Sequence, residues 1–219
     1  MFCQPGKVPS GRVPCQSRGG RRTVEKDGAE AGMGLAQWFS RKGVAPATAA
    51  AHLYAAAVGQ ARLPAFYSAC RVPDSIDGRF ELISLHTFLV LHRLAPEAGA
   101  RDLGQALFDR LFADMDRSLR ELGVGDMGIG RRIQAMAEGF YGRMAAYREA
   151  IAGDDAALEA ALRRNLYGTL RDAPAPTAAM AFYVRTAVAQ LAGQPLGDLA
   201  AGRIRFPPPP SDPDRETPT

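Results

Sequence analysis

The 219-residue sequence contains few of the residues from which disulfides, metal sites and catalytic centres are built. It has only three cysteines and three histidines, and it lacks His-Glu-x-x-His, Glu-x-x-His, phosphate-loop and Gly-x-Ser-x-Gly motifs. Cys3 and Cys15 have no second pair to complete a zinc site, and we expect Cys70 to be a buried apolar residue. His86 and His92 are six positions apart, which suits structural roles better than shared metal ligation. We therefore expect no metal, no cofactor and no enzymatic activity.

The sequence also lacks long hydrophobic runs and a concentrated basic stripe. The longest apolar stretch, Leu82 to Leu91, is interrupted by polar residues, so no transmembrane helix is predicted. Of the 27 basic and 23 acidic residues, 20 and 17 lie between positions 33 and 206. Arginine outnumbers lysine 24 to 3, which indicates a coding bias rather than phosphate binding. We therefore expect no DNA binding and no contact with RNA or the ribosome.

The two ends of the chain differ in composition from its middle. Residues 1–32 are rich in Gly, Arg, Pro and Ser without hydrophobic periodicity, so we predict disorder there and take Met33 as a candidate start. Residues 207–219 form a Pro-rich acidic tail that we also predict to be disordered. The segment 33–206 is predicted to be one helical domain. Its apolar opening, with two basic residues behind it, fits either a membrane surface or a helix docked on the core.

Helical periodicity runs through that domain, and no segment alternates as a strand does. Asp77 is the expected N-cap of a helix ending near Leu94, which is apolar nearly all round and should be the central buried helix. Gly123 should end the next long helix in a left-handed conformation, and Gly139 and Gly142 should permit close approach of a neighbour. The predicted fold class is all-α, a single compact domain of six or seven helices. The expected helices cover about 48–62, 77–94, 102–122, 129–152, 154–166 and 177–191, with a short aromatic segment between Pro64 and Pro73.

The helix predicted over 102–122 carries oppositely charged residues three and four positions apart. Their spacing alone favours a salt-bridged surface, and the alternative is a polar platform that meets a partner. If the platform exists, the candidate partner-binding residues are Asp114, Asp116, Arg117, Arg120, Glu121, Asp126, Arg131 and Arg143.

Three ordered blocks of sequence resemble the ubiquinol–cytochrome c chaperone family. Residues 73–81 (PDSIDGRFE) lead into 85–91 (LHTFLVL), residues 107–109 (LFD) lead to 114–126 (DMDRSLRELGVGD), and 140–143 (FYGR) come last. The resemblance covers about Leu53 to Phe206. It implies a non-enzymatic, all-helical assembly factor of ubiquinol–cytochrome c reductase (complex III). Mitochondrial members bind newly made cytochrome b, with a small partner protein, near the ribosome at the inner membrane.

For this chain the resemblance implies binding of cytochrome b or another complex III subunit. The implied location is the cytoplasm, with peripheral contact at the inner face of the plasma membrane. A chaperone of a membrane subunit needs an adaptable apolar groove. The methionines that could contribute to one are Met115, Met127, Met136, Met144 and Met180.

Two other functions stay open from the residues themselves. A helical lipid- or quinone-binding protein would show a single pocket deep enough for a prenyl chain. A helical enzyme with an unrecognised site would show buried carboxylates converging from the 109–126 region. An assembly chaperone would instead show an exposed groove, expected at the charged residues Asp114, Arg117, Arg120 and Asp126.

Overall fold

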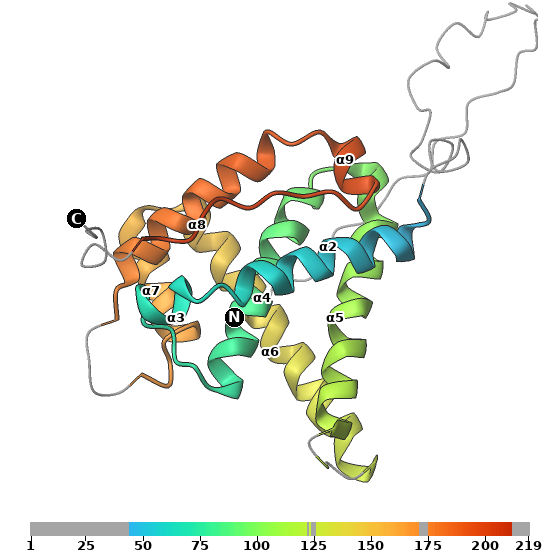
Figure 1. Cartoon of the computed structure of the whole chain (residues 1–219), viewed down its shortest axis with the longest axis horizontal. Coiled ribbons are helices and arrows are strands. Elements are labelled where there is room, and N and C mark those ends of the chain that lie inside the picture. The colour runs from blue at the N-terminus through green and yellow to red at the C-terminus, as the bar shows by residue number, and fades with distance from the viewer. Residues whose placement is uncertain (1–43, 122, 124–125, 171–174, 212–219) are drawn as a thin grey trace, which may run out of the picture. The chain divides into compact units, whose positions relative to one another are not determined.

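The computed structural model describes residues 44–121, 123, 126–170 and 175–211 (Figure 1). These residues form eight α-helices and one 3-10 helix, and they contain no strand, so the predicted all-α class is confirmed. The count exceeds the expected six or seven because of two short helices, α3 and α9. The elements are α2 (Pro46–Ala61), α3 (Ala65–Ser68), α4 (Ile76–Leu94), η1 (Ala98–Ala100), α5 (Arg101–Glu121), α6 (Asp126–Ala152), α7 (Asp155–Asn165), α8 (Thr177–Ala192) and α9 (Leu196–Ala200).

Helix α4 lies at the centre of the core. Its apolar character on every side predicted this position, and all ten residues from 81 to 90 are buried. It contacts α2, α5, α6 and α8. Leu85 and Leu89 are among the fully enclosed side chains, so the expectation of a central buried helix is confirmed.

The N-cap of α4 lies two residues before the predicted one. Ser75 is the N-cap, and its hydroxyl accepts a hydrogen bond from the Gly78 amide at 3.1 Å. Asp77, the predicted cap, lies instead in the first turn, where its charge favours the helix dipole. Gly78 is required here because a Cβ atom at this position would lie 2.0 Å from the Pro73 carbonyl oxygen.

Helices α5 and α6 run antiparallel beside each other (Figure 1). Gly123 follows α5 with a φ of +78°, the left-handed conformation expected for it. The apolar stripe of α5 is Leu103, Leu107, Leu111 and Met115, all buried, as the four-residue spacing predicts.

The glycines of α6 do not admit a neighbouring helix, contrary to expectation. A Cβ atom at Gly142 would meet nothing within 4 Å. At Gly139 it would meet only the guanidinium of Arg143, one turn along the same helix, at 2.7 Å. Gly139 therefore makes room for a side chain of its own helix.

The chain after α9 runs back along α8 (Figure 1). The side-chain amide of Gln194 binds both backbone groups of Arg205. It accepts a hydrogen bond from the Arg205 amide at 2.9 Å and donates one to the Arg205 carbonyl at 2.7 Å. Gln60 of α2 donates to the carbonyl of Pro207 at 2.8 Å, and Pro207 is buried. Packing of the helical domain thus continues past the expected boundary at 206. The predictions for residues 1–43 and 212–219 lie outside the described residues.

A buried histidine links α4 to α8 beneath this segment. The two ring nitrogens of His86 lie 2.8 Å from the Leu82 carbonyl and 2.8 Å from the Tyr183 hydroxyl. Burial lowers the pKa of His86 to about 4, so the ring is neutral at pH 7. The spacing of His86 and His92 favoured structural roles over shared metal ligation. In the structure His86 is fully enclosed and His92 is half-buried. Cys70 is fully buried, as expected.

Candidate functional site

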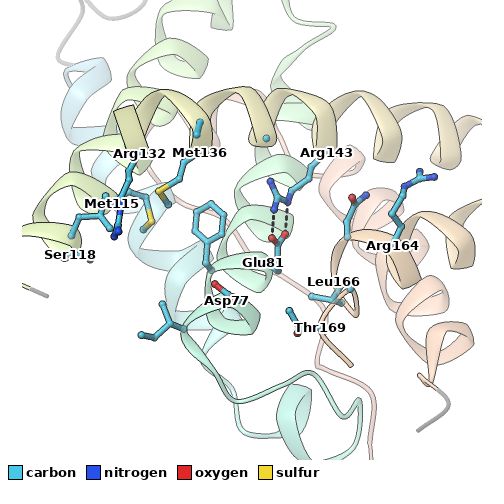
Figure 2. Close-up of a pocket in the computed structure, with 17 residues that line it drawn as sticks. Asp77, Glu81, Met115, Ser118, Arg132, Met136, Arg143, Arg164, Leu166 and Thr169 are labelled. Carbon is cyan, nitrogen blue, oxygen red and sulfur yellow. Dashed lines mark hydrogen bonds and ion pairs between the residues drawn. The ribbon is translucent and has the colours of Figure 1, made fainter. Parts of the chain in front are cut away.

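A groove of about 800 Å³ lies among four helices that are far apart in sequence. The first half of α4, the end of α5, the middle of α6 and the end of α7 contribute its walls (Figure 2). Apolar and polar side chains line it in nearly equal number, and seven of them are apolar. These are Ile76, Phe80, Met115, Leu119, Ala135, Met136 and Leu166.

The two ends of the groove differ in chemistry. In Figure 2, Met115 and Met136 lie together at one end, next to Ser118 and Arg132. At the other end lie Leu166, Thr169 and Arg164. Methionine is unbranched and polarizable, so the first end can adapt to apolar side chains of different shapes.

An ion pair between α4 and α6 crosses the middle of the groove (Figure 2). The Nε atom of Arg143 donates to Oε2 of Glu81 at 2.6 Å, and Nη2 donates to Oε1. The guanidinium also lies 5.7 Å from the centre of the Phe80 ring. This bidentate geometry fixes both side chains, because a forked guanidinium matches the two carboxylate oxygens.

The Glu81 carboxylate is mostly withdrawn from solvent, with 10% of its side chain exposed. Burial raises its pKa, and the hydrogen bonds from Arg143 lower it without cancelling the effect of burial. Removing Arg143 would leave a buried carboxylate without its counterion, which is strongly destabilising. The pair therefore depends on both partners.

The described side chains include polar atoms near the groove that have no hydrogen-bond partner. The Nδ2 atom of Asn165, a lining residue, is one of them. The hydroxyl of Tyr147, one turn after Arg143 on α6, is another, and this residue is almost fully enclosed. Both are donors, and burial holds the pKa of Tyr147 far above its usual range.

The charged residues predicted to bind a partner are spread over several faces. Arg143 lines the groove. Asp114 instead faces α2, where it accepts a hydrogen bond from the Tyr54 hydroxyl at 2.9 Å and pairs with Arg117. Asp116 pairs with Arg120 at 2.7 Å on a solvated face of α5.

Two more members of the predicted set also lie away from the groove. Glu121 and Arg131 are exposed, and the side chain of Asp126 lies outside the described residues. The groove is therefore displaced from the α5 charges that were expected to rim it. Partner binding by these charges remains a prediction.

Two of the five candidate methionines line the groove, Met115 and Met136. Met180 is fully buried in the core, and Met144 packs on another side of α6 near Arg101 and Arg148. The side chain of Met127 is outside the described residues. Glu81 was not predicted from the sequence. A signal for it existed, since a lone carboxylate inside an apolar run needs a partner when it is buried.

The described segments contain neither a cluster of metal-ligating side chains nor a membrane-spanning helix. No three His, Cys, Asp or Glu side chains of the described segments are grouped so that they could hold a metal ion. In the same segments, every helix is too short or too polar to span a bilayer.

Comparison with known proteins gives a family match over residues 68–206, described as ubiquinol-cytochrome C chaperone. Every residue that lines the groove falls inside this range. The chain belongs to the ubiquinol-cytochrome C chaperone family. The resemblance noted from the sequence blocks is therefore confirmed.

A solved structure and several curated proteins are similar to the chain. The crystal structure of the Cbp3 homolog from Brucella abortus is 40% identical, with a TM-score of 0.68, over 78% of this chain and 96% of that one. Ubiquinol-cytochrome-c reductase complex assembly factor 1 of Xenopus laevis is 28% identical over 141 residues, 64% of this chain and 70% of that protein. The mouse protein of that name is 25% identical over 162 residues, 73% of this chain and 55% of its own length.

Proposed function

We propose that this chain is a non-enzymatic assembly chaperone of ubiquinol–cytochrome c reductase. It holds a segment of cytochrome b, or of another subunit of that complex, in the groove between α4 and α6. The observation that carries the proposal is the coincidence of the groove with the family match, since all its lining residues lie within 68–206. The curated relatives are named as assembly factors of the reductase complex.

The chemistry of the groove suits an unassembled segment of a membrane subunit. Such a segment presents apolar side chains, for which Phe80, Met115 and Met136 provide an adaptable surface. It also carries polar groups, and the groove offers Arg132 and Arg164 beside the fixed Glu81–Arg143 pair. The chaperone would act in the cytoplasm, with peripheral contact at the inner face of the plasma membrane.

The two alternatives have less support. A prenyl chain would have to lie along the Glu81–Arg143 pair, which crosses the middle of the groove. An enzyme would need converging carboxylates, but Asp114 points toward Tyr54 and Asp116 toward Arg120. We therefore favour the chaperone.

Gene deletion with complementation tests the proposal. Loss of the gene should lower both spectroscopic cytochrome b and the assembled reductase, and the wild-type gene should restore both. Normal levels of both in the deletion strain would contradict the proposal.

A matched pair of variants links the effect to the groove. Met136 and Met144 are two turns apart on α6 and similarly half-buried, but only Met136 lines the groove. Met136→Gln should reduce the assembled reductase, while Met144→Gln should leave it near the wild-type level. Both proteins must melt at similar temperatures, so that a difference in assembly reflects binding rather than folding. Equal assembly with the two variants would place client binding elsewhere.

A further inference from the structure

A cluster of four aromatic rings lies along the line where α5 meets α6. Phe108 and Phe112 of α5 have ring centres 4.7 Å apart, and both pack on Phe140 of α6 at 5.9 and 6.0 Å. Tyr141 stacks on Phe108 with centres 5.2 Å apart. Phe140 is fully buried and anchors the other three.

The outer rings of this cluster are accessible to a partner. Tyr141 is 57% exposed, and Phe108 and Phe112 are half-buried. We call these three residues the aromatic patch. The Tyr141 hydroxyl makes no hydrogen bond to any residue that the structure describes. Exposed aromatic side chains held by a buried anchor are typical of the centres of protein interfaces.

The aromatic patch is separate from the groove. Tyr141 and Arg143 are two positions apart on α6, which places them about 200° apart around the helix axis. Phe108 and Phe112 lie on the same side of α5 as Met115 but one to two turns earlier along the helix, before the first α5 residue that lines the groove. The two surfaces share no residue.

Carboxylates without counterions border the patch on both helices. Asp109 lies beside Phe108, and its partner is the neutral amide of Gln105 at 2.8 Å. Glu138 lies one turn before Tyr141, and its partner is the neutral amide of Gln134 at 3.0 Å. Within the described part of the chain, neither carboxylate forms an ion pair. The patch is therefore an apolar strip with a negative border, on a chain whose net charge is +4.

We propose that the aromatic patch docks an amphipathic helix of another protein, with an apolar strip flanked by Lys or Arg. The line between two antiparallel helices accepts a third helix whose apolar side chains contact the rings. Lysine or arginine on its flanks would meet Asp109 and Glu138, which supplies charge complementarity. This second surface acts independently of the client groove.

Two synthetic helical peptides with the same strip of leucines provide the probe. The strip is flanked by lysines in one peptide and by glutamates in the other. Fluorescence anisotropy with the full chain should show binding of the lysine peptide, about tenfold or more tighter than the glutamate peptide. This preference should decrease as salt is raised.

Variants locate the binding surface. Tyr141→Ala should weaken the binding of the lysine peptide about tenfold, because it removes a central aromatic contact. The pair Asp109→Asn and Glu138→Gln keeps the hydrogen bonds to the glutamines and should abolish the preference for lysine. Phe182→Ala, which removes an aromatic ring 76% exposed on α8, is the matched control and should leave binding unchanged.

Four results would overturn the proposal. They are no binding of the lysine peptide, equal affinity for the two peptides, an unchanged affinity in Tyr141→Ala, and a larger loss in Met136→Gln than in Tyr141→Ala. The last would place the peptide in the groove. Sedimentation of the chain alone adds a further test. A dimer that dissociates in Tyr141→Ala would show that a second copy of this chain covers the patch.

Discussion

Glu81 and His86 lie on the same buried stretch of α4, and the core accommodates each in a different way. Glu81 keeps a counterion, because Arg143 reaches it from α6 with two hydrogen bonds. His86 has no counterion and stays neutral between the Leu82 carbonyl and the Tyr183 hydroxyl. The charged Glu81 lies at the groove, while the neutral His86 lies in the closed core. The charge state of each side chain therefore follows its access to solvent.

The neutral state of His86 predicts a specific loss of stability in acid. Burial depresses its pKa from 6.5 to about 4, so the unfolded chain binds a proton before the folded chain does. Stability is therefore fully present above pH 6.5 and is lost as the pH falls toward 4. The wild-type chain should lose about 3 kcal/mol more than His86→Gln over this window. Urea unfolding at several pH values measures the difference.

His52→Gln provides the control for that comparison, because the His52 side chain is exposed. Its stability should change with pH as the wild type does. If His86→Gln instead follows the wild-type pH curve, the pKa of His86 does not differ between the folded and unfolded chain, and the prediction is wrong.

Leu89 tests the burial of α4 with a single side chain. It is 1% exposed in the structure. Leu89→Ala should lower the free energy of unfolding by ~2–5 kcal/mol, because it removes contacts and leaves a cavity. Leu63→Ala, at a position 36% exposed, should cost much less. Similar losses from the two variants in urea unfolding would show that α4 is not the centre of the core.

At the scale of elements, periodicity predicted the long helices and failed for the short ones. The four-residue spacing of α5 identifies its buried stripe directly. The helix expected over 154–166 is also present, and Asp154 caps it by accepting a hydrogen bond from the Ala157 amide at 2.8 Å. Helix α9 has five residues, too few for a period to be visible. The N-cap of α4 was misplaced because Ser75 and Asp77 both suit that role, and only the three-dimensional course of the turn at Pro73 decides between them.

The glycines of α6 give a prediction at this scale. Gly142→Ala should raise the free energy of unfolding by about 0.5–1 kcal/mol, because alanine favours the helix and the added methyl meets nothing. Gly139→Ala gains the same helix preference but displaces the guanidinium of Arg143. It should therefore be less stable than Gly142→Ala by about 1 kcal/mol or more, since the buried carboxylate loses its best geometry.

Urea unfolding of the two variants side by side gives the comparison. Equal stabilisation by both would mean that the Glu81–Arg143 pair tolerates the displacement and does not fix the middle of the groove.

At the scale of the whole molecule, the sequence predicted the fold and family far better than the site. The ordered blocks from Pro73 onward indicated the family, and the match over 68–206 confirms it. The groove combines four helices, and local spacing does not report which faces of different helices meet. The chemistry of methionine indicated that Met115 and Met136 could line a groove, and they do. It could not separate them from Met144 or the buried Met180, which do not line it.

The charges of α5 illustrate the same limit. Pairs three and four apart were visible in the sequence, and two of them form, Asp114–Arg117 and Asp116–Arg120. The direction in which these side chains point was not visible in the sequence, because it depends on where α2 packs. Tyr54 of α2 orients Asp114 away from the groove, while Arg143, from the distant block 140–143, reaches into it.

Site-specific photo-crosslinking in the native host tests most directly whether the groove holds a reductase subunit. A photo-activatable residue replaces Met136 in the groove, and in a second variant it replaces the exposed Phe182 on α8. Illumination of cells that are assembling the reductase should give an adduct at position 136 that contains cytochrome b or another subunit of the complex. Position 182 should give little or none. Equal adducts at both positions, or no reductase subunit in the adduct at 136, would contradict the account.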